Sequence, residues 1–233
     1  MIRFCLFDVY GTLFSNEGLF RNTAERLSQV IPSMHADDLE IEVQKLYHQV
    51  FERIFQQENA FESERTMYRQ VYAILQENYQ IRIDVSKWMD QMYEDFASKP
   101  IYPDTFDTLQ EFREKGCTIT FLSNIDQAPL KGLLARYPDL PYDYAVSSEE
   151  ARCYKPHPGI FNRALSLMNA SVEETVMVGD NYRADIQGGK ALGMKTVWIN
   201  RYSPHQSPSE DHPDADLRIH TLAEMVEWME RKR

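Results

Sequence analysis

Asp8-Val9-Tyr10-Gly11-Thr12-Leu13 is the stretch that decides the fold, because it places a carboxylate, a glycine and a hydroxyl directly after an apolar run. That run, residues 2–7, is typical of a buried strand that ends at Asp8. Gly11 permits a tight turn immediately beyond such a strand. In open parallel sheets, ligands bind in the crevice beyond the carboxyl ends of the strands. We therefore expect Asp8 to lie at the ligand-binding edge of an α/β sheet.

Residues 15–99 show helical periodicity. Apolar residues in this stretch recur at spacings of three and four, and no segment has a convincing strand pattern. The clearest runs are Leu39, Val43, Leu46, Tyr47, Val50 and Ile54, then Met67, Val71, Ile74 and Leu75, and then Trp88, Met92 and Phe96. This pattern predicts an all-α cap domain at residues 15–99, inserted after the first strand as a mobile lid on the core.

Strands and helices alternate after Pro100. We predict strands at residues 117–122, 144–146, 175–178, 196–199 and 217–219, and helices near residues 106–112, 160–167, 186–192 and 222–229. Residues 203–213 contain three prolines and little that is apolar, which predicts a surface loop. The alternation favours a doubly wound, Rossmann-like parallel sheet with helices on both faces. Its core domain comprises residues 1–14 and 100–233.

The composition excludes several classes of protein. No apolar run reaches the ~18 residues of a membrane span, and the N-terminus passes directly into a strand pattern, so we expect a cytoplasmic protein. The formal net charge of −11 argues against binding to nucleic acid or to an anionic membrane surface. A small anionic substrate remains compatible with this charge. The sequence indicates no particular oligomeric state. Cys5 and Cys117 lie in apolar runs, which is typical of reduced packing thiols.

Three further segments carry polar side chains in a defined order. Ser123-Asn124 follows one apolar run, Lys155-Pro156 comes next, and a segment from Gly179 to Asp185 follows another apolar run. Together with the stretch that begins at Asp8, these segments resemble the ordered motifs of the haloacid dehalogenase superfamily. Members of that superfamily are hydrolases that use an aspartate as the attacking nucleophile, and they insert type 1 caps directly after the first strand.

The resemblance implies a catalytic role for five residues. Asp8 matches the nucleophile, and Thr12 would contribute a donor near the bound anion. Ser123 would hold an oxygen of the transferring phosphoryl group, and Asn124 would orient local structure or substrate. Lys155 would offset the repulsion between Asp8 and an anionic substrate, which is ~4 kcal/mol for unit charges ~4 Å apart at an effective dielectric constant near 20.

The resemblance also implies a magnesium site. Asp180 and Asp185 match the acidic pair that fixes Mg²⁺ in phosphatases of the superfamily. We expect Asp8, Asp180 and the main-chain carbonyl oxygen of Tyr10 to bind the metal directly, with Asp185 acting directly or through water. Such oxygen ligands are those that Mg²⁺ prefers.

Tyr10 departs from the usual phosphatase pattern, which has an acid/base aspartate at this position. Tyrosine, with a reference pKa near ~10, can donate a proton but is a poor base at neutral pH. A tyrosine here resembles the 2-haloacid dehalogenases, yet those enzymes usually replace the acidic residue that matches Asp180. Phe161 stands where many dehalogenases have a tyrosine after the motif lysine. A dehalogenase also needs an arginine that binds the substrate carboxylate, and only Arg21 and Arg53 are candidates for that role.

Three functions therefore stay open at the level of the sequence. The retained Asp180 favours a Mg²⁺-dependent phosphatase that acts on a small phosphorylated metabolite. Tyr10 favours a metal-independent 2-haloacid dehalogenase. A Mg²⁺-dependent binding or regulatory protein with weak or no turnover is the third alternative.

Overall fold

The computed structural model describes residues 2–55, 61–201 and 214–230, and the chain divides into two compact units. The core unit contains Met1–Ser15, Pro100–Asn124 and Tyr137–Arg233. The helical unit contains Asn16–Lys99 and Ile125–Arg136. The chain thus enters the helical unit twice, and its second entry begins one residue after Asn124.

The core unit is built on a six-stranded parallel sheet with the strand order β3-β2-β1-β4-β5-β6. The first strand, β1, lies in the interior of the sheet between β2 and β4, so residues far apart in sequence become neighbours. This arrangement confirms the predicted Rossmann-like sheet. The strands are β1 (Phe4–Phe7), β2 (Thr118–Ser123), β3 (Tyr144–Ser147), β4 (Thr175–Gly179), β5 (Lys195–Ile199) and β6 (Leu217–Ile219).

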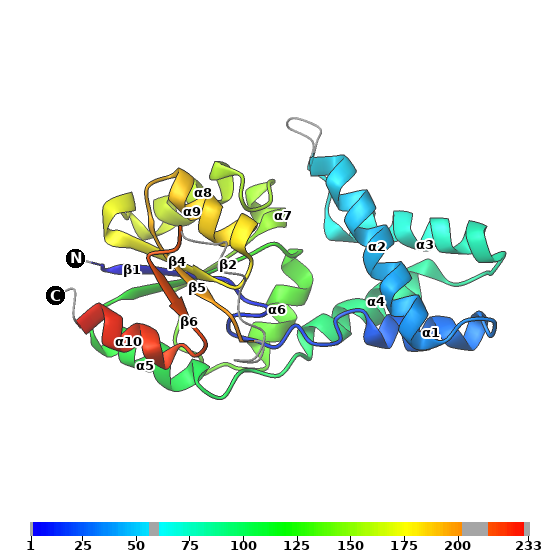
Figure 1. Cartoon of the computed structure of the whole chain (residues 1–233), viewed down its shortest axis with the longest axis horizontal. Helices are drawn as coiled ribbons and strands as arrows, with labels where there is room; N and C mark the ends of the chain where they lie inside the picture. The colour runs from blue at the N-terminus through cyan, green and yellow to red at the C-terminus, as the bar shows by residue number, and fades with distance from the viewer. Residues whose placement is uncertain (1, 56–60, 202–213, 231–233) are drawn as a thin grey trace. The chain divides into compact units, whose positions relative to one another are not determined.

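Helices cover both faces of this sheet. Figure 1 shows α8 (Pro158–Met168) and α9 (Gly188–Ala191) on one face, and α5 (Thr105–Glu114) and α10 (Ala223–Glu230) on the other. Phe161 of α8 is fully buried in the apolar cluster between helix and sheet, where Leu6, Leu122 and Met177 also lie. Phe161 is therefore a packing residue of the core.

Some elements differ from their predicted bounds. A π-helical turn, Tyr182–Gln187, precedes α9, so helical backbone begins four residues before the predicted helix at residues 186–192. A short helix α7 (Ser148–Ala151) and a 3₁₀ turn (Val172–Glu174) were not predicted. The predicted loop at residues 203–213 lies outside the described residues.

The helical unit contains α1 (Arg21–Val30), α2 (Ala36–Phe55), α3 (Glu64–Tyr79), α4 (Val85–Ala97) and α6 (Gln127–Ala135). Ser63 and Asp84 begin α3 and α4 by accepting hydrogen bonds from backbone amides of the first turn. The predicted bounds of 15–99 omit α6, and the role of this unit as a lid stays a prediction.

Among the described residues, no helix combines the length and apolarity that a membrane span requires.

A buried polar cluster joins four helices of this unit. Glu64 is 5% exposed, and its Oε1 accepts a hydrogen bond of 2.9 Å from the Tyr47 hydroxyl. Its Oε2 is buried without a hydrogen-bond partner among the described residues. Asp126, the residue before α6, accepts from Glu64 N and Arg65 N, each at 2.9 Å, and from the Tyr93 hydroxyl at 2.5 Å. Burial and the nearby Asp126 charge raise the pKa of Glu64 to about 8.

We predict that Glu64 makes the free energy of unfolding fall as pH rises from about 4.5 to about 8. The unfolded chain releases this proton near the ordinary pKa of 4.5, whereas the folded chain keeps it to a pKa of about 8. The folded state therefore binds more protons across this window, and stability falls by about 1.4 kcal/mol per pH unit. Glu64→Gln removes the titration, so urea unfolding at pH 5 and pH 8 measures the difference from wild type.

The matched control is Glu77→Gln, which changes an exposed carboxylate on the same helix. Relative to wild type, Glu64→Gln gains stability between pH 5 and pH 8, and Glu77→Gln does not. Equal pH dependence in Glu64→Gln and wild type contradicts a protonated Glu64.

Candidate functional site

Three adjacent strands deliver the polar residues to one edge of the sheet. Asp8 directly follows β1, Ser123 is the last residue of β2, and Asp180 directly follows β4. Because β1 pairs in parallel with both β2 and β4, the carboxyl ends of these strands are neighbours. The strand order therefore explains how segments more than 100 residues apart meet at one site.

The turn after β1 is stabilised by its own backbone. The carbonyl oxygen of Val9 accepts hydrogen bonds of 2.9 Å from the amides of Leu13 and Phe14. Gly11 takes a φ of 84°, a left-handed conformation that favours glycine. Thr12 is fully buried, and its Oγ1 has no hydrogen-bond partner among the described residues. A buried hydroxyl without a partner costs free energy, so its presence beside the nucleophile position suits a ligand oxygen.

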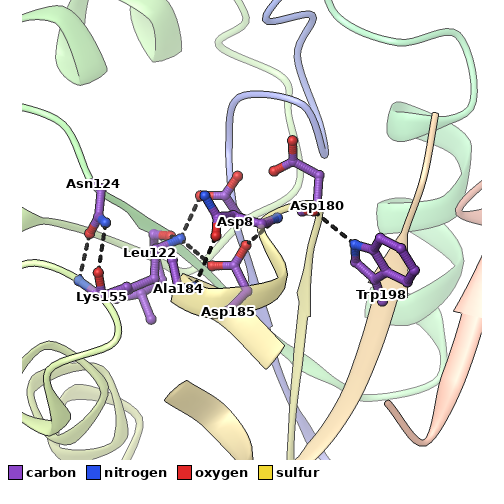
Figure 2. Close-up of polar contacts among 9 residues, drawn as sticks. Asp8, Leu122, Asn124, Lys155, Asp180, Ala184, Asp185 and Trp198 are labelled. Atoms are coloured by element: carbon purple, nitrogen blue, oxygen red, sulfur yellow. Dashed lines mark hydrogen bonds and ion pairs between the residues drawn. The ribbon is translucent and has the colours of Figure 1, made fainter. Parts of the chain in front are cut away.

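Lys155 places a buried ammonium group at the centre of the site. Its Nζ lies 2.5 Å from Asp8 Oδ1, 2.7 Å from Asp185 Oδ1 and 2.7 Å from the carbonyl oxygen of Leu122. Figure 2 shows the side chains of Asp8, Lys155 and Asp185 pointing toward one another. Burial alone lowers the pKa of Lys155, but the attraction of the two carboxylates outweighs it and raises the pKa. Lys155 is therefore charged at neutral pH.

Asn124 holds the main chain of Lys155 with both ends of its amide. Asn124 Nδ2 donates to the carbonyl oxygen of Lys155 at 3.0 Å, and the amide of Lys155 donates to Asn124 Oδ1 at 2.7 Å (Figure 2). Ser123, the preceding residue, is buried at 3% exposure. The Ser123-Asn124 segment thus fixes the backbone from which the Lys155 ammonium extends.

Three carboxylates form an acidic cluster at this edge. Oxygen atoms of Asp8, Asp180 and Asp185 all lie within 4.8 Å of one another. Burial, together with the charges of Asp8 and Asp185, raises the pKa of Asp180 well above its ordinary value. Burial also raises the pKa of Asp185 to about 7, although Lys155 opposes this rise. One ammonium group does not balance three carboxylates, so the donor set fits a divalent cation with oxygen ligands.

Two residues that sequence reasoning missed support this arrangement. Trp198 of β5 donates its indole N–H to the carbonyl oxygen of Asp180 at 2.8 Å (Figure 2). Arg201 donates from Nε to the carbonyl oxygen of Thr12 at 2.8 Å, and its Nη1 lies 3.0 Å from Asp104 Oδ1. Neither residue belongs to a recognisable motif. Both contacts depend on strand order and side-chain direction, which the sequence alone does not show.

The candidate arginines belong to the helical unit. Arg21 forms ion pairs with Glu25, Asp37 and Glu40. Arg53 donates to the side chain of Gln70. The charge of Arg21 is thus already shared among three carboxylates of its own unit.

The comparisons with known proteins agree with this fold and site. A family model for haloacid dehalogenase-like hydrolases matches residues 2–193. The chain therefore belongs to the haloacid dehalogenase-like hydrolase family, as the ordered motifs predicted, and it is a hydrolase.

Among named relatives, the chain is 37% identical over 92 residues to a glyceraldehyde 3-phosphate phosphatase of Pyrococcus furiosus, covering 39% of this chain and 38% of that protein. It is 30% identical over 131 residues to a phosphoserine phosphatase of Thermus thermophilus, covering 54% of this chain and 50% of that protein. The chain thus spans half or less of the length of these two relatives. A pyrophosphatase PpaX of Bacillus cereus is 28% identical to this chain, and the match covers 84% of this chain and 82% of the length of that protein.

Solved structures show the same fold. An L-2-haloacid dehalogenase of Xanthobacter autotrophicus has a TM-score of 0.78 at 19% identity, covering 99% of both chains. A phosphatase of this superfamily from Thermococcus onnurineus has a TM-score of 0.67 at 22% identity, covering 98% of both chains. At these identities the likeness concerns the fold alone, which both reaction types share.

We predict that Lys155→Met lowers the free energy of unfolding by about 3–5 kcal/mol in metal-free buffer, because it leaves two buried carboxylates without their cation. Urea unfolding measures this loss. Lys131→Met is the control, since it removes an exposed ammonium group on α6 and changes stability by less than about 0.5 kcal/mol. A loss for Lys155→Met as small as that of the control contradicts the role of Lys155 in balancing Asp8 and Asp185.

Proposed function

We propose that the protein is a Mg²⁺-dependent phosphatase that uses Asp8 as its nucleophile and acts on a small phosphorylated metabolite. The observation that carries this proposal is the acidic cluster of Asp8, Asp180 and Asp185, whose oxygens lie within 4.8 Å of one another. A metal-independent reaction has no need for three such carboxylates beside one ammonium group. The relatives named as phosphatases support the same reaction class.

The residues that would hold Mg²⁺ are Asp8, Asp180 and the main-chain carbonyl of Tyr10, with Asp185 bound directly or through water. Bound there, Mg²⁺ supplies positive charge that neutralises the carboxylates and the substrate phosphate. Trp198 and Asp185 fix the backbone around Asp180, because Trp198 bonds to its carbonyl oxygen and Asp185 Oδ2 accepts from the next amide, Asn181 N, at 3.1 Å. The acidic residues are thus held in place before any ligand arrives.

Hydrolysis proceeds in two displacements at phosphorus. In the first, a carboxylate oxygen of Asp8 attacks, an aspartyl phosphate forms, and the bond to the leaving group breaks. Lys155 balances the negative charge at Asp8, while the hydroxyls of Thr12 and Ser123 donate to phosphoryl oxygens. In the second, a water molecule attacks the same phosphorus, the bond to Asp8 breaks to regenerate its carboxylate, and both protons of the water leave with the product as dihydrogen phosphate.

Tyr10 narrows the substrate class. An alkoxide leaving group requires a proton, and the usual donor is the aspartate that Tyr10 replaces. An acyl phosphate or a phosphoanhydride departs as a stable anion and requires no such proton. We therefore propose a substrate with a good leaving group, or one that carries its own proton donor.

The second candidate function is dehalogenation of a short 2-haloacid, which Tyr10 favours because halide also leaves without a proton. This reaction requires a cation for the substrate carboxylate. Of the two candidates for that role, Arg21 forms ion pairs with three carboxylates of its own unit, and Arg53 donates to the side chain of Gln70. Chloride release from 2-chloropropionate that persists with a chelator would establish this function and displace the phosphatase.

We predict that Tyr10→Asp raises kcat on a simple alkyl phosphate by on the order of 10²-fold, because it restores a general acid. Wild type hydrolyses acetyl phosphate faster than glycerol phosphate with Mg²⁺, and Tyr10→Asp narrows that preference. Release of inorganic phosphate measures both activities. On acetyl phosphate, whose leaving group needs no proton, Tyr10→Phe, which keeps the ring but has no hydroxyl, behaves like wild type.

The nucleophile provides the decisive control for this assay. Asp8→Asn lacks the attacking carboxylate and releases no phosphate from either compound. Phosphate release that survives in Asp8→Asn, or the absence of Mg²⁺-dependent turnover in wild type on a panel of phosphorylated metabolites, rejects the proposed function.

We predict that Gly179→Ala weakens Mg²⁺ binding by at least about tenfold. A Cβ at Gly179 would lie 2.1 Å from Asp185 Oδ2 and 2.3 Å from its Cγ, so the Asp185 side chain must move. Isothermal titration calorimetry with MgCl₂ measures the affinity. Gly116→Ala is the control, because its new Cβ has no atom within 4 Å, although its φ of 79° makes an alanine there strain the backbone. Wild-type affinity in Gly179→Ala contradicts a role for Asp185 in the metal site.

A further inference from the structure

Arg201 is a buried cation that the proposed mechanism does not use. It follows β5 in the core unit, and its side chain is 8% exposed. Burial lowers the pKa of Arg201, and the charge of Asp104 opposes this shift. The guanidinium of an arginine stays protonated even so. A buried charge is unfavourable unless it is paired and its N–H groups find acceptors. The contacts of Arg201 therefore show what offsets this cost.

Asp104 and Tyr102 hold the guanidinium in place. Arg201 Nη1 lies 3.0 Å from Asp104 Oδ1, and the guanidinium carbon lies 4.0 Å from the centre of the Tyr102 ring. Asp104 is the N-cap residue of α5, yet its side chain makes no hydrogen bond to that helix. Asp104 Oδ2 instead accepts from Arg201 Nη1 at 3.2 Å and from Leu222 N at 2.7 Å. The guanidinium is thus anchored at the starts of α5 and α10.

Arg201 connects this anchor to the turn after β1. Its Nε donates to the carbonyl oxygen of Thr12 at 2.8 Å. The N–H of the same peptide group, which belongs to Leu13, donates to the carbonyl oxygen of Val9 at 2.9 Å. The C=O and N–H of a trans peptide point in opposite directions, so the two hydrogen bonds hold this group from both sides. A rotation of the peptide group about its Cα–Cα axis breaks both of them.

The orientation of this peptide group determines the direction of the Thr12 side chain. The Cα atom of Thr12 lies in the plane of the group, and a threonine has few allowed χ1 rotamers. Thr12 is fully buried, and among the described residues no hydrogen bond holds its Oγ1 atom. The direction of the hydroxyl therefore depends on the backbone that carries it.

The segment that anchors Arg201 also holds the next carbonyl of the turn. The carbonyl oxygen of Leu13 accepts from Tyr102 N and from Thr105 Oγ1, each at 3.0 Å. These contacts fix the position of the turn, but a peptide group can still rotate between two fixed Cα atoms. Among the described side chains, Arg201 is the one that opposes this rotation from the carbonyl side of Thr12.

We propose that Arg201 is a positioning residue for phosphoryl transfer: by holding the carbonyl oxygen of Thr12, it sets the direction of the Thr12 hydroxyl toward the transferring phosphoryl group. The kinetic part of this proposal rests on the proposed phosphatase function, whereas its structural part, the fixed peptide group, does not. A planar guanidinium donates from Nε and pairs through Nη1 at the same time, whereas a lysine has its three donors on one atom. The role therefore needs an arginine.

Arg201→Lys tests the proposal, because it keeps the charge but loses the planar fork. We expect kcat on acetyl phosphate with Mg²⁺ to fall about tenfold while KM stays within about twofold, as for a shift of reacting groups after binding. Arg113→Lys is the matched control. Arg113 Nη2 also donates to a main-chain carbonyl oxygen of the core unit, that of Tyr142, at 3.0 Å, and to Asp143 Oδ1 at 3.3 Å. Its replacement leaves kcat unchanged.

A double-mutant cycle with Thr12→Val separates positioning from a merely structural role. Thr12→Val keeps the shape of the side chain and removes the hydroxyl. If Arg201 acts through this hydroxyl, Arg201→Lys lowers kcat about tenfold in wild type and by less than about twofold in Thr12→Val. Equal losses of kcat in both backgrounds overturn the proposal, because Arg201 then acts elsewhere than through Thr12.

Amide hydrogen exchange of the full-length protein, followed by NMR, needs no turnover. Arg201→Lys speeds exchange of the Leu13 amide by at least about tenfold, because its peptide group rotates more freely. The Asp8 amide, which donates to Val178 O in the sheet, exchanges as in wild type. Tyr102→Leu removes the ring beside the guanidinium and gives the same pattern more weakly, so it replaces Arg201→Lys if that variant does not fold.

Exchange of the Leu13 amide at the same rate in Arg201→Lys and Arg113→Lys overturns the proposal, since the peptide group is then fixed without Arg201. Wild type without Mg²⁺-dependent release of inorganic phosphate rejects the phosphatase function, and the kinetic part falls with it. The exchange rate of the Leu13 amide then still decides whether Arg201 fixes the peptide group.

Discussion

The buried ammonium group of Lys155 is the interaction on which the rest of the site depends. It lies within 2.7 Å of carboxylate oxygens from both Asp8 and Asp185, and the three side chains come from segments that are remote in sequence. Bringing two carboxylates together in a buried position is unfavourable without a cation. The main chain of Leu122 and the side chain of Asn124 hold Lys155 in place. Strand order, ion pairing and loop position thus define one site together.

The same electrostatics explains why this site fits a divalent cation. After Lys155 is paired, the carboxylate of Asp180 lies in a buried acidic environment that raises its pKa. A chain that catalysed only metal-independent chemistry would be more stable with a neutral residue there. The retained Asp180 and the substituted Tyr10 therefore favour phosphoryl transfer to Asp8 from substrates whose leaving group needs no proton.

The sequence predicted the core fold well, because buried parallel strands have clear apolar runs that end at polar residues. Asp8, Ser123 and Asp180 each follow such a run, and the strand order makes these strand ends neighbours. The contacts of Trp198 and Arg201 were not predictable, since a hydrogen bond to a main-chain carbonyl leaves no motif in the sequence. Trp198 reaches the carbonyl oxygen of Asp180 because β5 pairs with β4, and Arg201 reaches the carbonyl oxygen of Thr12 because of the position of the turn after β1. Both facts are known only from the structure.

The grouping of helices in the helical unit was not predictable from the sequence, for a different reason. Periodicity identifies amphipathic helices locally, but it does not show which helices pack together. Residues 125–136 follow a core strand in sequence, yet α6 groups with α1 to α4. Asp126 reads as an ordinary cap of α6, and only its contacts with Glu64, Arg65 and Tyr93 show that it binds α3 and α4. Long-range polar contacts of this kind are decided by tertiary packing.

The most direct test of the central claim is to identify the covalent species on the nucleophile. Wild type mixed with acetyl phosphate and Mg²⁺, quenched in acid within the first turnover and digested, is examined by peptide mass spectrometry. We predict a phosphoryl group on the peptide that contains Asp8, absent when Mg²⁺ is withheld. A carboxyalkyl ester on Asp8 after mixing with 2-chloropropionate and a chelator, with no phosphoryl adduct under the first conditions, would contradict it.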